Sequence, residues 1–105
     1  MAEATLARWD GIGAPSGAAL EALFAAEGLK PYSWSNGPGE TYQPHSHSYH
    51  KVLYCVSGEI TFRLLPRGID LKLAPGDRLD IPPRQEHAAF VGPRGVTCLE
   101  APRPG

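Results

Sequence analysis

Four histidines are the residues of this chain best suited to chemistry, and three of them are spaced so that they could meet. His45 and His47 form an H-x-H pair, and His87 opens a predicted strand much later in the chain. Alternate side chains of a strand point to one side, so His45 and His47 would share a face, about 7 Å apart along the strand. Two imidazoles on one face can share a metal ion when a third ligand arrives from a neighbouring strand. The alternative is a pair of polar residues on a solvated strand face.

The residues around these histidines extend the pattern. The first stretch runs through Gly39, five residues, the H-x-H pair, three residues, Lys51, six residues and Gly58, and the second through Gly76, five residues, Pro82, Arg84, two residues and His87. These offsets resemble the two-part signature of the cupin superfamily, G-x5-H-x-H-x3,4-E-x6-G and G-x5-P-x-G-x2-H-x3-N, over about residues 35–100. The resemblance implies an all-β, small antiparallel double-stranded β-helix, or jelly-roll barrel, often found as a homodimer. It also implies His45, His47 and His87 as metal ligands inside that barrel.

Three positions depart from the signature. Lys51 replaces its glutamate, Arg84 its glycine and Val91 its asparagine. The last two are a turn position and a strand position without a ligand role, but a protonated lysine repels a cation held nearby. Three outcomes are open for Lys51. It could lose its proton in a desolvated interior, it could turn aside toward a carboxylate or an anionic substrate, or the site could hold no metal.

Other side chains could complete a metal shell. Glu40, Glu86 and Glu100 are candidate carboxylates, and the sequence does not choose among them. His50 is one residue out of phase with the H-x-H pair, which reverses its face in a regular strand, so we expect it at the surface or the rim. Three neutral imidazoles suit Zn, Cu, Ni or Fe(II) and leave positions open for water or substrate.

Short predicted strands must position these residues. Turn residues divide the chain after Leu29 about every ten residues, which is typical of a sandwich or barrel. The expected strands are 30–35, 49–56, 60–65, 69–73, 78–81, 87–91 and 96–101. Alternation places Lys51, Leu53 and Cys55 inside and Val52 and Tyr54 outside. Because that outer face is apolar, we expect a second subunit to cover it, which favours a homodimer.

The ends of the chain differ from this central part. Ser16 can cap a short helix with Leu20, Leu23 and Phe24 on one face, and Gly28 would stop it. Residues 1–10 could form an arm or a second helix. We therefore expect residues 1–28 to be an arm and helix packed on the barrel, 29–101 to be the barrel, and 102–105 to be a loose tail.

Composition excludes some functions. Ten basic and eleven acidic residues give a formal charge of −1, and no basic stripe stands out, so we expect no nucleic-acid partner. No apolar run approaches the length of a membrane span, and the first ten residues lack the apolar segment of a secretion signal. We therefore expect a cytoplasmic protein in which Cys55 and Cys98 are reduced thiols rather than a disulfide.

Function is less constrained than fold, since barrels of this type host many chemistries. The leading hypothesis is a metal-dependent protein acting on a small polar or anionic molecule in an oxygenase- or isomerase-like reaction. Lys51 would be its catalytic residue, as a cation toward an anionic substrate or as a base. The alternative is a non-catalytic module that binds or senses a small ligand through Lys51 and the histidines without metal. A third hypothesis is a structural dimer with a vestigial site.

Overall fold

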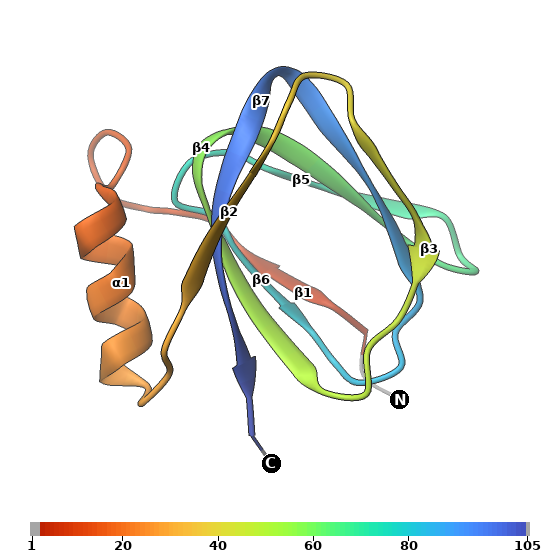
Figure 1. Ribbon diagram of the computed structural model, residues 1–105, viewed down its shortest axis with the longest axis horizontal. Helices are drawn as coiled ribbons and strands as arrows, with labels where there is room; N and C mark the ends of the chain where they lie inside the picture. The colour runs from red at the N-terminus through yellow and green to blue at the C-terminus, as the bar shows by residue number, and fades with distance from the viewer. Residues whose placement is uncertain (1–2, 105) are drawn as a thin grey trace.

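Two long strands organise the protein in the computed structural model, which describes residues 3–104. They are β4 (His50–Leu64) and β7 (His87–Arg103), and they pair antiparallel from His50↔Arg103 to Leu64↔His87. Both bend near their middle, where the register shifts around Ser57 and Gly58. Each long strand therefore contributes to both walls of the barrel (Figure 1).

Shorter strands complete the two walls. The first half of β4 pairs with β6, which pairs with β1, and the second half of β7 pairs with β2. The second half of β4 pairs with β5, and the first half of β7 pairs with β3. The bounds are β1 Thr5–Ala7, β2 Tyr32–Asn36, β3 Thr41–His45, β5 Ile69–Leu73 and β6 Arg78–Ile81. The predicted all-β antiparallel barrel with a short helix is confirmed.

The continuity of β4 and β7 differs from the sequence prediction. Each was expected as two strands separated by a turn, at residues 57–59 in β4 and 92–95 in β7. In the structure Gly58 has φ 75°, and a Cβ placed there would lie 1.9 Å from the carbonyl oxygen of Gly95. The two bends thus contact each other backbone to backbone. Each strand therefore bends while β4 and β7 stay paired on both sides of the bend.

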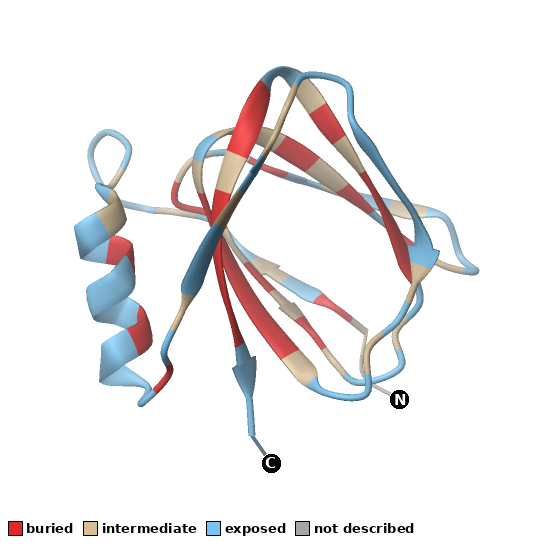
Figure 2. Ribbon diagram, in the orientation of Figure 1, coloured by how far each residue is buried: buried red, intermediate tan, exposed pale blue. Residues whose placement is uncertain are grey.

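The N-terminal segment covers the outside of the barrel. Helix α1 (Gly17–Ala26) begins at Ser16, whose hydroxyl accepts a 3.1 Å hydrogen bond from the Ala19 amide, as predicted for its cap. Leu20 and Phe24 are fully buried, and the Phe24 ring meets the edge of Tyr54 with centroids 5.2 Å apart. Figure 2 shows these buried positions on the side of the helix that faces the barrel.

This packing corrects two expectations. Leu23, predicted on the buried face, is 39% exposed, because it lies beside the stripe that Leu20 and Phe24 form. Val52 and Tyr54 do point outward, but α1 packs over them rather than a second subunit. The apolar face that favoured a homodimer is therefore covered within the chain itself.

The termini join the barrel more than expected. Residues 5–7 form β1 rather than a helix, and β1 extends the sheet beside β6. Pro102 and Arg103, predicted to be loose, continue β7 opposite Lys51 and His50. Strand β2 begins opposite Glu100, so β7 is an edge strand beyond that point and tolerates a proline there. The predicted loose end at residue 105, and residues 1 and 2 of the predicted arm, lie outside the described residues.

None of the helices in residues 3–104 has the length and apolarity that crossing a membrane requires. Cys55 and Cys98 oppose each other across β4 and β7 as free thiols, and both are buried in the core.

We expect Gly58→Ala to destabilise the protein by roughly 3–5 kcal/mol, because a methyl group adds a backbone clash to the strain of a positive φ. Gly68 is the matched control, since its φ is 73° and a Cβ placed there would have nothing within 4 Å. Gly68→Ala should cost only about 1–2 kcal/mol. Urea denaturation measures both, and equal losses would contradict the close contact of the two bends.

A second pair of variants tests the docking of α1. Leu20→Ala removes a fully buried side chain and should cost about 2–5 kcal/mol, whereas Leu23→Ala on the exposed side should cost under about 1 kcal/mol. Thermal or urea unfolding gives the difference. A helix that does not pack on the barrel would respond to the two substitutions alike.

Candidate metal centre

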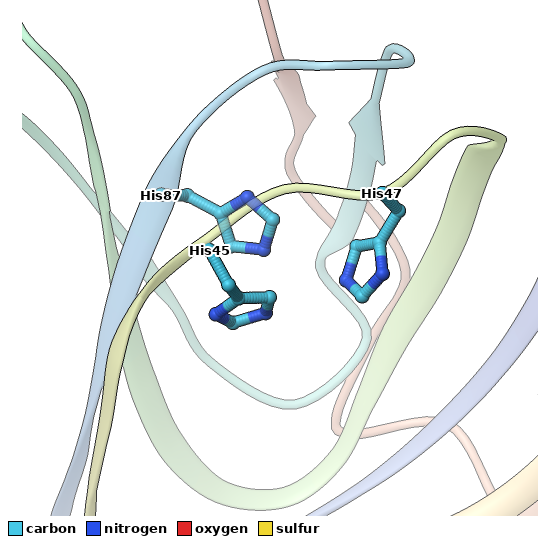
Figure 3. Close-up of side chains that lie close together, drawn as sticks. All are labelled: His45, His47 and His87. Carbon is cyan, nitrogen blue, oxygen red and sulfur yellow. The ribbon is translucent and has the colours of Figure 1, made fainter.

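The three predicted ligands come together from two neighbouring strands and a loop (Figure 3). His45 ends β3 and is the direct register partner of His87 at the start of β7. His47 lies beyond β3, so strand alternation does not align it with His45 as the sequence suggested. Its carbonyl oxygen instead accepts a 2.7 Å hydrogen bond from the Arg84 amide, which ties its loop to the turn before β7.

Arg84 explains one departure from the sequence signature. Its φ is 66°, in the left-handed region that glycine adopts without steric cost. The position that carries glycine in the signature therefore keeps its backbone conformation here with an arginine. The conformation directs the Arg84 amide toward His47 and so helps to place the third imidazole.

The three imidazoles surround one small volume. One nitrogen of each ring lies within 4.8 Å of the others, and the ring centroids of His45 and His87 are 4.4 Å apart. Nδ1 of His45 lies 2.8 Å from the Gln43 carbonyl oxygen, and Nδ1 of His87 lies 2.9 Å from that of Gln85. A carbonyl only accepts, so both Nδ1 atoms carry the proton, and both Nε2 atoms present a lone pair.

Two nitrogens of the histidine cluster have no hydrogen-bond partner among the described residues. Within residues 3–104, Nε2 of His47 and Nε2 of His87 are buried and make no hydrogen bond. A buried polar atom without a partner costs free energy, typically about 1–3 kcal/mol, so such atoms are uncommon unless a ligand satisfies them.

The surroundings favour the uncharged form of His47 and His87. Burial, assisted by the nearby His45 and Lys51, lowers the pKa of His87 to about 4. Burial and the charge of Lys51 also lower the pKa of His47. Neutral imidazole is the form that binds a metal ion. At neutral pH His47 and His87 can therefore bind a cation without first releasing protons.

Lys51 takes the second of its three predicted outcomes and turns toward a carboxylate. Its Nζ lies 3.4 Å from Oε2 of Glu100, and both side chains are at least nine-tenths buried. Glu100 also accepts hydrogen bonds from the Tyr32 hydroxyl at 2.5 Å and from the Trp34 indole at 2.9 Å. The histidine cluster thus faces a buried ion pair held by two aromatic side chains of β2.

A cavity of about 310 Å³ joins the histidines to this ion pair. Its volume is at the lower end of the range for small-molecule sites. The aromatic and charged side chains of β2, β3, β4 and β7 form its walls. The lining residues are Tyr32, Trp34, Tyr42, His45, His47, Lys51, Phe62, His87, Ala89 and Glu100.

The other candidate ligands lie elsewhere. Nε2 of His50 is 2.8 Å from Oδ1 of Asp80, outside the cavity lining, in agreement with its expected place at the rim. Glu40 bonds to the side chain of Asn36, and Glu86 is exposed. Glu100 is the one of the three candidate carboxylates that lines the cavity. Its inward direction could have been inferred from alternation with Cys98 in the same strand, but its pairing with Lys51 depends on strand order.

Comparisons with known proteins agree with this architecture. The profile of the cupin domain family matches residues 34–94, a span that contains all three histidines and Lys51 but not Glu100. A search of the curated proteins found no match.

Three solved structures illustrate the similarity. An RmlC-like cupin from Shewanella frigidimarina is 26% identical with a TM-score of 0.62, over 73% of this chain and 67% of that one. KdgF from Halomonas sp. is 29% identical with a TM-score of 0.57, over 72% of this chain and 70% of that one. The DMSP lyase DddQ from Ruegeria pomeroyi is 25% identical with a TM-score of 0.65, over 72% of this chain. The aligned part spans only 38% of that lyase.

The lowered pKa of His87 predicts how stability depends on pH in metal-free protein. The unfolded chain protonates this histidine near its ordinary pKa of 6.5, whereas the folded protein does so only near 4. Unfolding therefore takes up a proton in this window, and the free energy of unfolding should fall by roughly 1–3 kcal/mol from about pH 7 to about pH 4.5. Urea denaturation with a chelator present measures it. His87→Gln should show a shallower dependence, and an unchanged dependence would contradict the assignment to His87.

Proposed function

The chain belongs to the cupin domain family, and we propose that it is a metal-binding cupin acting on a small polar or anionic molecule. His45, His47 and His87 would hold a divalent transition metal. The observation that carries this proposal is the pair of buried Nε2 atoms, on His47 and His87, without hydrogen-bond partners. They converge with His45 inside a cavity large enough for a compact ligand.

The donor set fits such an ion. All three donors are imidazoles, which suit Zn, Fe(II), Ni or Cu better than Mg or Ca. Backbone carbonyls hold two of the rings in the tautomer that exposes Nε2, the usual outer support of a metal-binding histidine. Three protein ligands leave a coordination position open toward the cavity, as in catalytic rather than structural sites.

The roles of the protein side chains follow from their places in the cavity. A bound ion would supply Lewis acidity toward a substrate oxygen. Lys51 would be the catalytic residue, because its ammonium lines the same cavity and can donate a hydrogen bond or a proton to the substrate. Phe62 and Ala89 form an apolar part of the wall that restricts water, which strengthens both electrostatic interactions.

An open metal position beside a small cavity supports an oxygenase- or isomerase-like reaction. The similarity to a DMSP lyase supports an enzyme. Non-catalytic binding of a small ligand without metal is the alternative that the experiment below separates. A homodimer stays a prediction of the family resemblance alone.

Elemental analysis of the purified protein tests the metal site. We expect near-equimolar transition metal in the wild type and less than about a tenth of it in the His45→Ala/His87→Ala double variant, because two of three donors are lost. His50→Ala is the matched control, since His50 lies outside the cavity lining, and it should keep its metal.

Reconstitution completes the test. Wild-type protein that stays empty after exposure to Zn, Fe(II), Ni and Cu would overturn the metal-binding proposal. Ligand-induced thermal shifts in that metal-free protein would then favour the binding module.

A further inference from the structure

The ammonium of Lys51 has hydrogen-bonding capacity that the protein does not use. Its side chain is 10% exposed, yet within residues 3–104 it donates no hydrogen bond. The nearest carboxylate oxygen, Oε2 of Glu100, is at 3.4 Å, beyond the usual 2.7–3.2 Å range for N–H···O bonds. Lys51 lines the cavity, so the donors of its ammonium that the protein leaves free are available to an acceptor on a ligand.

The charge of Lys51 is already balanced. Glu100 is buried beside it and is held in place by Tyr32 and Trp34, so the two opposite charges share one wall of the cavity. A ligand carboxylate brought to Lys51 would also approach the carboxylate of Glu100 and be repelled by it. A ligand ammonium would be repelled by Lys51 in the same way. The wall therefore disfavours a charged group of either sign.

We propose that Lys51 and Glu100 form a subsite for an uncharged hydroxyl group of the ligand. A hydroxyl can accept a hydrogen bond from Lys51 and donate one to Glu100, because each carboxylate oxygen has lone-pair capacity beyond the bond it already accepts. This inference deepens the proposed function and rests on it. It places any anionic group of the substrate on the metal side of the cavity and makes the substrate class a compact hydroxy acid or polyol.

The rest of the cavity agrees with such a ligand. Its volume of about 310 Å³ limits the ligand to a compact molecule. Trp34 and Tyr42 meet edge to face with centroids 6.0 Å apart, and both line the cavity. These rings give the carbon skeleton of the ligand an apolar surface between the two polar ends.

Three small probes on zinc-loaded protein test the subsite. 3-Hydroxypropionate carries one carboxylate and a hydroxyl, propionate lacks the hydroxyl, and malonate has a second carboxylate in its place. We expect 3-hydroxypropionate to bind at least about tenfold more tightly than either of the others by calorimetry, because only it satisfies both Lys51 and Glu100. Tightest binding by malonate, equal binding by all three, or no binding would overturn the proposal.

Glu100→Gln separates a charge effect from a loss of structure. The substitution keeps the side-chain shape and an oxygen for Tyr32 or Trp34 but removes the repulsion toward an anion. Malonate should therefore gain affinity in this variant by about tenfold relative to 3-hydroxypropionate. A variant that merely folds less well would lose affinity for all probes in proportion, and this result would contradict the assigned role of Glu100.

Binding to the subsite can also be measured in metal-free protein, so that this test does not depend on whether the histidines bind a metal ion. The indole N–H of Trp34 bonds to Glu100, so its NMR signal reports binding at the subsite. Trp9→Phe assigns the signal by removing the other indole. 1,3-Propanediol should shift the Trp34 signal without metal, and malonate should not. This pattern would support the subsite even in a protein that binds no metal, whereas a shift with malonate alone would overturn it.

Discussion

The antiparallel ladder between β4 and β7 is the constraint on which the rest of the structure depends. It runs the full length of both strands, and it bends where Gly58 meets the backbone at Gly95. On one side of the bend β4 pairs with β6, and on the other with β5. The bend therefore turns two strands into two walls and creates the interior. His45, His87 and the Lys51–Glu100 pair lie on residues that these walls turn inward, and His47 joins them from the loop after β3.

The sequence predicted the parts of the fold that have local signals. Strands 69–73 and 78–81 were predicted with the bounds they have, because turn residues flank them and their apolar residues alternate. The unbroken paths of β4 and β7 were not predicted, since a glycine in a bulge and a glycine in a turn look the same in sequence. The cover over Val52 and Tyr54 was assigned to another subunit, because nothing local shows where a helix thirty residues earlier will pack.

The residues of the site likewise divide into those that the sequence could identify and those that only the strand order shows. The three histidines could be found from fixed offsets, although His47 reaches them through its loop bond to Arg84 rather than by strand alternation. Glu100 could be nominated only as one of three carboxylates. Its selection depends on β7 lying beside β4 and β2, a long-range pairing that places it against Lys51 and below Tyr32 and Trp34. Residues that act together across strands are visible only once the strand order is known.

The exchange of glutamate for lysine at position 51 changes the charge of the site less than the sequence suggests. An acidic residue, Glu100, still lines the cavity. It comes from β7 and lies beside Lys51, not at position 51 itself. The added positive charge is thus balanced locally, and the lowered pKa values of His47 and His87 keep these two rings neutral at pH 7. A cation entering the cluster meets a charge-balanced wall rather than an isolated ammonium. Lys51 and three imidazoles that could hold a metal ion can therefore share one small cavity because Glu100 is buried with them.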